Sequence, residues 1–211
     1  MDLVFVSRRQ AERWASVQGF SSSQLAEFNH LLQTALSRWI PKRSLRGSIH
    51  IDSGSFGKIY RSSLDGQEVA VKEIGQSGGS SLRSKMTEIS LELCALVLVD
   101  HPHCVKFQGA TVDFAAMQPS ISLVFEMCSG GSLHKHMFEF CRPLSVGRKV
   151  QIGSQVASGL AYLHSQHILH RDLNTRCTSH RDDGAQGTFF SHLVFGVQEH
   201  PSQWRHDRED R

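Results

Sequence analysis

Three short β-prone runs within residues 49–74 constrain the fold of this 211-residue chain more than any other feature. They occupy residues 49–51, 58–60 and 68–74. The dipeptide Asp65-Gly66 separates the last two runs, and it is the strongest local signal for a tight β-hairpin turn. The most economical prediction is therefore a three-stranded antiparallel meander.

A turn rich in glycine and serine, D-S-G-S-F-G at residues 52–57, joins the first two predicted strands. Glycines let the backbone approach a ligand closely and point N–H groups at phosphate oxygens. Such turns are common in hairpins, so this one alone is a weak signal. The run V-A-V-K at residues 69–72 strengthens it, because the valines hold the strand in the core while Lys72 points its ammonium toward a nucleotide phosphate.

The run S-G-S-F-G-K-I-Y at residues 53–60, followed by V-A-V-K, resembles the small lobe of a eukaryotic protein kinase. One departure stands out. Asp52 occupies the place of the first glycine in the family's G-x-G-x-x-G pattern. Its side chain adds bulk and negative charge near the expected polyphosphate, so we expect a lower nucleotide affinity.

Residues 82–98 predict the helix that the family calls helix C. Its expected inward stripe is Leu82, Met86, Ile89, Leu93 and Leu96. In the family a glutamate on this helix pairs with the lysine of the third strand. Glu92 is the better match, because its distance to His101-Pro102 fits the family's spacing, and Glu88 stays open as the alternative.

Residues 121–127 predict a buried fifth strand that runs into the hinge between the two lobes. By resemblance, Phe125 is the gatekeeper beside the adenine pocket, and the backbone of Glu126 and Cys128 bonds the base. The G-G-S-L run at residues 130–133 is typical of the tyrosine-kinase-like group of serine/threonine kinases.

The run beginning His170-Arg171-Asp172 resembles the kinase catalytic loop, H-R-D-L-x-x-x-N, in which the Asp is the general base and the Asn holds magnesium. The Asn position is Cys177, and no D-F-G follows it. The run V-F-G at 194–196 lacks the carboxylate and lies too far downstream. Magnesium prefers hard oxygen ligands, so we expect phosphoryl transfer to be severely impaired.

Two amphipathic helices flank these motifs. The first starts at Ser21, where Ser21 and Gln24 predict a reciprocal capping box, and ends before Pro41. Its apolar stripe is expected to dock on the following domain and consists of Leu25, Phe28, Leu32, Leu36 and Trp39. The second is capped by Ser145, and its stripe, expected to lack its usual large-lobe partners, consists of Val146, Val150, Val156, Leu160 and Leu163.

Composition narrows the function classes further. The formal charge of +3 is too small and too evenly spread to indicate nucleic-acid binding, and no run approaches the length of a membrane span. The five cysteines include no C-x-x-C pair, which favours reduced thiols in a cytoplasmic setting. Zinc ligation by the His101–Cys104 loop, or by Cys177 with the histidines that follow it, fits no zinc-finger spacing.

We therefore predict an α+β fold: a protein-kinase-like small lobe, with an antiparallel sheet and helix C, and only the first helices of the large lobe. The expected parts are an N-terminal helical segment (1–47), a partial kinase domain (48–176) and a disordered tail (177–211). The resemblance implies Asp172 and Lys72 as catalytic residues. It implies an ATP site made of Ile51, Gly54, Ser55, Phe56, Gly57, Ile59, Ala70, Lys72, Glu92, Phe125, Glu126 and Cys128.

The function implied is transfer of the γ-phosphate of ATP to protein hydroxyls by a serine/threonine kinase, impaired here because both magnesium ligands are missing. The expected partners are ATP and a protein substrate or partner kinase that the sequence does not identify. Two alternatives stay open. One is a catalytically silent pseudokinase that binds a partner through its small lobe and N-terminal helix, and the other is a truncated product of splicing or of a gene model.

Overall fold

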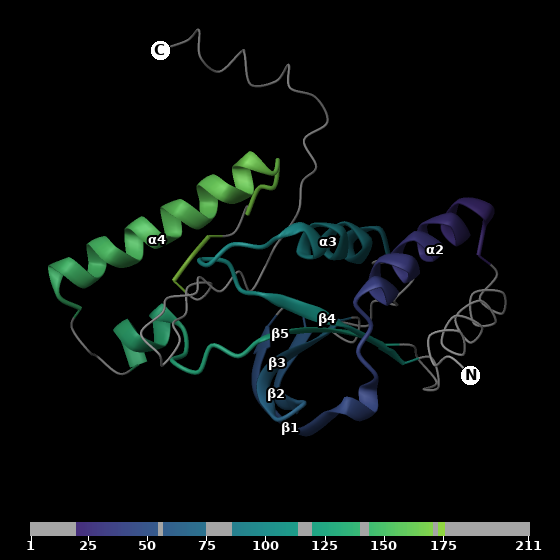
Figure 1. The fold of residues 1–211 in the computed structure, drawn as a ribbon, viewed down its shortest axis with the longest axis horizontal. Coiled ribbons are helices and arrows are strands. Elements are labelled where there is room, and N and C mark those ends of the chain that lie inside the picture. The colour runs from purple at the N-terminus through teal and green to yellow at the C-terminus, as the bar shows by residue number, and fades with distance from the viewer. Residues whose placement is uncertain are drawn as a thin grey trace, which may run out of the picture.

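A five-stranded antiparallel sheet organises this computed structural model, which describes residues 20–54, 57–74, 86–113, 120–139, 144–170 and 173–175. The strand order is β1-β2-β3-β5-β4 (Figure 1). The strands are β1 (Leu45–Gly54), β2 (Gly57–Leu64), β3 (Gln67–Ile74), β4 (Phe107–Asp113) and β5 (Ser120–Glu126). The predicted antiparallel meander is confirmed, and its strands extend beyond the predicted runs.

The turn between β2 and β3 lies at Asp65-Gly66, as predicted. Both residues have positive φ angles, 51° and 84°, which a two-residue type I′ turn requires. The turn pairs Leu64 with Gln67 and sets the register of the whole hairpin, in which Ile59 lies opposite Lys72. A local sequence signal therefore determines which β2 side chain lies beside the lysine.

The two faces of the sheet carry separate apolar clusters. Opposite residues on antiparallel strands point to the same face, and successive residues alternate. The face toward α3 (Met86–Leu98) contributes Ile74, Ala110, Ile121 and Leu123 to the larger cluster, together with Ile89 and Leu93 of α3. The other face carries the smaller cluster of Ile40, Val69, Val71 and Val124.

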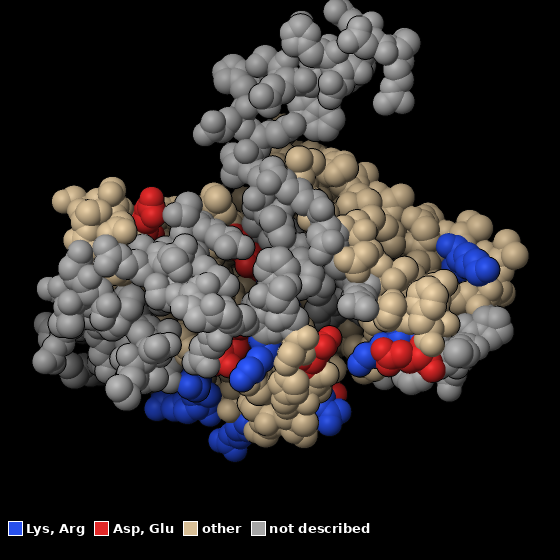
Figure 2. Space-filling view, turned by 180° about the vertical axis from the view of Figure 1, so that it is seen from behind, with Lys and Arg blue, Asp and Glu red and all other residues tan. Residues whose placement is uncertain are grey.

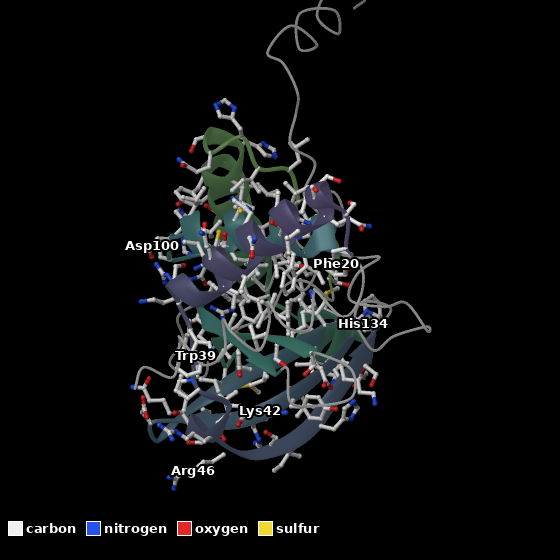
Figure 3. The ribbon with its side chains drawn as sticks, turned by 90° about the vertical axis from the view of Figure 1, so that its right-hand side faces the viewer. Phe20, Trp39, Lys42, Arg46, Asp100 and His134 are labelled. Atoms are coloured by element: carbon white, nitrogen blue, oxygen red, sulfur yellow. The ribbon has the colours of Figure 1, made fainter. Side chains whose placement is uncertain are left out.

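Helix α2 (Ser22–Ser37) lies beside α3 on the same side of the sheet, as the two views in Figures 1 and 3 agree. The predicted capping box is present: Gln24 N–H donates to Ser21 Oγ, and Ser21 N–H donates to the Gln24 side chain. The prediction that this helix docks on the following domain is confirmed.

The predicted stripe of α2 is wrong in part. Leu25 is 39% exposed, and Trp39 lies beyond the helix, which ends at Ser37. The buried residues of the helix are Phe28, Leu31, Leu32 and Ala35. The stripe failed because its step from Leu36 to Trp39 assumed a helix that continues past Arg38, whose backbone leaves the helical region.

The segment after α2 extends the sheet at its β4 edge. Ile40 N–H donates to the carbonyl of Ala110, and Ala110 N–H donates to the carbonyl of Arg38, at 2.8 and 2.9 Å. The backbones approach so closely that a Cβ on Gly109 would lie 2.9 Å from Ile40 and would overlap the Arg38 carbonyl. The short 3₁₀ helix η1 (Lys42–Ser44) then leads into β1.

Helix α4 (Val146–Ser165) follows the single-turn π-helix η3 (Lys135–Glu139). Ser145 caps α4 as predicted, since its hydroxyl accepts a hydrogen bond from Arg148 N–H. Leu163 is fully buried, whereas Val146 and Val150 are 76% and 66% exposed. Only the carboxyl-terminal half of the predicted stripe packs on the rest of the described chain. None of the described helices is both long enough and apolar enough to cross a membrane.

Candidate functional site

A salt bridge joins the sheet to α3 at the centre of the predicted site. Nζ of Lys72 donates to Oε1 of Glu92 over 2.9 Å, and the two side chains are only 11% and 14% exposed. A charge held away from water needs a partner, and each of these residues supplies it for the other. The predicted pairing with Glu92 is thus present in the structure, while the side chain of Glu88 lies outside its described part.

Three further predicted residues share the sheet face of Lys72. Ile59 lies directly opposite Lys72 on β2. Ala70 lies two residues before it, and Phe125 lies opposite Ala70 on β5. Phe125 also packs edge-to-face on Phe107, with ring centroids 5.6 Å apart. The register therefore places an apolar surface next to the charged pair, as a base beside its phosphates would require.

The hinge strand is held at Glu126 by the segment that precedes β4. Glu126 N–H donates to the carbonyl of Lys106 over 3.0 Å, and Lys106 N–H donates to Oε1 of Glu126 over 2.8 Å. The N–H of Glu126 is already used, so a backbone bond from this residue to a base must come from its carbonyl oxygen. Cys128 is 5% exposed, and its carbonyl accepts a bond from Gly131 N–H.

The glycine-rich turn closes the β1–β2 hairpin. Gly54 lies opposite Gly57, while Ser55 and Phe56 lie outside the described residues. Asp52, at the place of the missing glycine, accepts a hydrogen bond from Ser53 N–H over 2.8 Å and lies opposite Ile59. Ile51 sits at a register shift between its neighbours and is 38% exposed, so the register does not assign it to either face.

The predicted catalytic loop is described only at its two ends. His170 is 3% exposed, as suits the scaffold role predicted for it. At the other end, the Thr175 carbonyl accepts a hydrogen bond from His134 N–H over 2.9 Å, which ties the loop to the start of the large-lobe helices. Asp172, Cys177 and the V-F-G run at 194–196 lie outside the described residues, so the position of the general base stays a prediction.

Tyr162 of α4 is a functional contact that the sequence reasoning missed. Its hydroxyl accepts from Asp100 N–H over 3.0 Å and donates to the Leu98 carbonyl over 3.2 Å, just after α3. Its ring stacks on His101 at a centroid distance of 4.9 Å. An amphipathic ring on an apolar helix face was the available signal. Tyr162 thus fixes the carboxyl-terminal end of the helix that carries Glu92.

The loop of residues 101–104 is occupied by packing. Burial, and then the neighbouring charge of His103, lower the pKa of His101. Burial raises the pKa of Cys104 to about 12, which disfavours the thiolate that would bind zinc. Among the residues that the structure describes, no group of three or more His, Cys, Asp or Glu side chains is placed to hold a metal ion.

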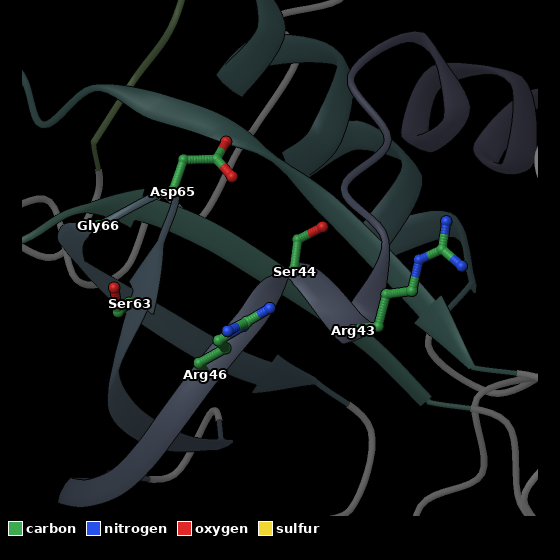
Figure 4. A pocket seen from close by; sticks show the side chains of 6 residues that line it. All are labelled: Arg43, Ser44, Arg46, Ser63, Asp65 and Gly66. Atoms are coloured by element: carbon green, nitrogen blue, oxygen red, sulfur yellow. The ribbon is translucent and has the colours of Figure 1, made fainter.

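A separate hollow of about 650 Å³ lies at the far end of the β2–β3 hairpin (Figure 4). It is lined by Arg43, Ser44, Arg46, Ser63, Asp65 and Gly66. Asp65 is six residues from Lys72 along the hairpin, roughly 20 Å of extended strand, so this hollow is not part of the site around the salt bridge. Figure 2 shows acidic and basic side chains interspersed on the face that it draws.

Comparison with known proteins identifies the class to which this site belongs. The model of the protein tyrosine and serine/threonine kinase family matches residues 45–178, which is well over half of the chain. The chain therefore belongs to the protein kinase family. The match begins at the first residue of β1 and spans the sheet, the hinge and the predicted catalytic loop.

The relatives are serine/threonine kinases. A probable serine/threonine-protein kinase of Dictyostelium discoideum is 33% identical over 126 residues, which are 59% of this chain and 13% of that protein. The serine/threonine-protein kinase TNNI3K of Mus musculus is 37% identical over 137 residues, 64% of this chain and 16% of that protein. TNNI3K belongs to the tyrosine-kinase-like group, which confirms the predicted grouping.

The cytokinesis protein sepH of Emericella nidulans is 37% identical over 122 residues, 57% of this chain and 8% of that protein. This chain thus spans less than a sixth or so of the length of the relatives named here. The similarity concerns the kinase domain, and it does not extend to the rest of those proteins.

Proposed function

We propose that this chain binds ATP on the sheet face shared by Ile59, Ala70, Lys72 and Phe125, as a kinase-type small lobe. The salt bridge between Lys72 and Glu92 is the observation that carries the proposal. An ammonium has three N–H donors, and Glu92 accepts a bond from one of them. The carboxylate thus fixes the lysine at the sheet, and the other donors serve phosphate oxygens.

The hinge supports binding of the base. A carbonyl acceptor at Glu126 suits the exocyclic amino group of adenine, and a backbone N–H at Cys128 would suit a ring nitrogen. Phe125 and Ala70 supply apolar surface for the ring itself. This set of groups resembles what small-molecule sites generally provide: an apolar lining with a few fixed polar groups that set orientation.

Magnesium does not fit the residues present. The Asn position of the catalytic loop is Cys177, whose sulfur is a soft ligand, and residues 177–211 contain no D-F-G carboxylate. We therefore derive no step through a metal ion. Asp172 retains a carboxylate that is able to accept a hydroxyl proton, but the charge of the transferred phosphoryl group lacks its main counter-ion. Transfer to protein serine or threonine is severely impaired.

A phosphotransfer assay with γ-labelled ATP and a generic protein substrate tests this part of the proposal. We expect no transfer above background from the wild-type chain, and none from Cys177→Asn, because that change restores only one of two magnesium ligands. Robust transfer by either protein, abolished by Lys72→Met, would show that the assignment of impairment is wrong.

A partner-binding role is the second candidate, and one surface favours it. Phe138, Val146 and Val150 are 61%, 76% and 66% exposed on η3 and α4. Apolar side chains exposed together mark interaction sites more often than scattered ones do. The apolar face of α2 is buried within the chain, so it does not serve the partner contact first expected of that helix. Sedimentation of the wild type against Val146→Lys/Val150→Lys tests for association through this surface.

A further inference from the structure

Helix α2 contacts the helix that carries Glu92 along two registers at once. Leu31 and Ala35 of α2 belong to the same buried cluster as Ile89 and Leu93 of α3, and they are 0% and 1% exposed. Beside this apolar seam, His30 Nδ1 lies 3.1 Å from Ser90 Oγ. One turn further, Thr34 Oγ1 lies 3.8 Å from Cys94 Sγ. The N-terminal segment thus packs on α3 by shape and by polar contacts.

These contacts define the relative orientation of the two helices. The step from His30 to Thr34 and the step from Ser90 to Cys94 are both four residues, so the helices run in the same direction. Each residue advances about 100° around a helix, so Glu92 lies about 200° from both Ser90 and Cys94. The face of α3 that α2 contacts is therefore opposite the face that presents Glu92 to Lys72.

This arrangement couples α2 to the salt bridge. The end of α3 is tied to α4 by the Tyr162 hydroxyl, which bonds Leu98 and Asp100. A rotation of α3 that withdraws Glu92 from Lys72 would pull Ser90 and Cys94 away from His30 and Thr34. Because packed interfaces resist continuous deformation, α2 opposes that rotation.

We infer that Leu31, His30 and Thr34 of α2 are positioning residues for the nucleotide site: they hold α3 in the rotation in which Glu92 engages Lys72, and so raise nucleotide affinity without touching the nucleotide. The inference rests on the proposed ATP binding. It predicts that loosening α2 lowers the fraction of molecules competent to bind, and the apparent dissociation constant rises in inverse proportion to that fraction.

Calorimetric titration of the full chain with ATP tests this coupling. Leu31→Ala and His30→Ala are expected to raise the dissociation constant, Leu31→Ala by about tenfold, within the usual range of coupling between sites. The matched control is Ile40→Ala, which removes a comparable buried side chain from the cluster on the opposite sheet face. We expect it to change the dissociation constant by less than about twofold, a small fraction of the coupling expected for Leu31→Ala.

A reversible lock separates positioning from general destabilisation. Thr34→Cys places a thiol beside Cys94, where the present 3.8 Å separation allows a disulfide after a small side-chain rotation. In the Leu31→Ala/Thr34→Cys chain, oxidation should restore the lost affinity and reduction should remove it again. The same pair in a Cys94→Ser background should show no redox effect. If the disulfide does not form, the comparison of Leu31→Ala with Ile40→Ala decides alone.

The outcomes separate this inference from the proposed function. Equal losses of affinity in Leu31→Ala and Ile40→Ala, or a disulfide that restores nothing, would overturn the positioning role and leave ATP binding intact. A wild-type chain that binds no ATP would overturn the proposed function and, with it, the affinity claim. Hydrogen exchange then judges the α2 contact separately: amides of residues 89–98 that exchange no faster in Leu31→Ala than in Ile40→Ala would overturn it.

Discussion

Lys72 of β3 and Glu92 of α3 form a salt bridge of 2.9 Å whose side chains are only 11% and 14% exposed. Removing one partner leaves the other charge largely withdrawn from water. We expect Lys72→Met to lower the free energy of unfolding by about 2–3 kcal/mol, with Lys72→Met/Glu92→Leu recovering part of that loss. Urea denaturation of the four chains of this double-mutant cycle measures the coupling.

The surface pair Arg61–Glu68 is the matched control for this cycle. Its atoms are 3.7 Å apart and its side chains are 44% and 58% exposed. Exposed pairs contribute little, so Arg61→Met should change the unfolding free energy by less than about 1 kcal/mol. Similar coupling in both pairs would contradict the burial argument.

Gly109 is the position where a side chain has no room. A Cβ there would overlap the Arg38 carbonyl, whereas a Cβ on Gly153 of α4 would meet nothing. We expect Gly109→Ala to destabilise by about 1–3 kcal/mol, because it forces the segment after α2 away from β4. Gly153→Ala should instead stabilise by up to about 1 kcal/mol. Thermal unfolding of the two variants gives the sign of each effect.

Local signals predicted the fold well, and contacts between distant segments limited the rest. The Asp65-Gly66 turn and the Ser21–Gln24 capping box depend on neighbours in sequence, so both were predictable. The bonds of Arg38 and Ile40 to Ala110 join segments about seventy residues apart, and nothing local predicts them.

The candidate site shows the same division. Lys72 and Glu92 were predictable from motif spacing, and Ile59 and Phe125 follow from the hairpin register once the turn is known. The use of Glu126 N–H by Lys106 was not predictable, because it depends on how the loop before β4 lies against the hinge. Periodicity also predicted a stripe on α4, but burial of Val146 and Val150 depends on a neighbouring surface, which periodicity does not encode.

Tyr162 should stabilise the end of α3 through its hydroxyl. Tyr162→Phe keeps the stacking on His101 and removes the bonds to Asp100 N–H and the Leu98 carbonyl. We expect a loss of about 1–2 kcal/mol and faster hydrogen exchange at the Asp100 amide. Tyr60→Phe is the comparison, since its bond to Glu73 spans 3.5 Å, at the limit of a hydrogen bond, and its loss should matter little. An unchanged Asp100 exchange rate would rule out this role.

Cys104 should make the protein less stable in alkali. Burial raises its pKa to about 12 in the folded chain, from a reference value of 9.0. Because the folded pKa is the higher one, the unfolded chain loses this proton first as the pH rises. Its contribution is therefore complete below about pH 9 and is lost progressively toward pH 12. The unfolding free energy of Cys104→Ala should fall less steeply over that window than that of the wild type, and parallel curves would refute the prediction.

Direct titration of the chain with ATP, in buffers with magnesium and with chelator, tests the central claim most directly. We predict saturable binding to the wild type, weakened at least about tenfold by Lys72→Met, since one charge-assisted bond to phosphate contributes about 1.5–3 kcal/mol. Arg61→Met should bind as the wild type does. Absence of binding in every buffer, or equal affinity in Lys72→Met, would contradict the account.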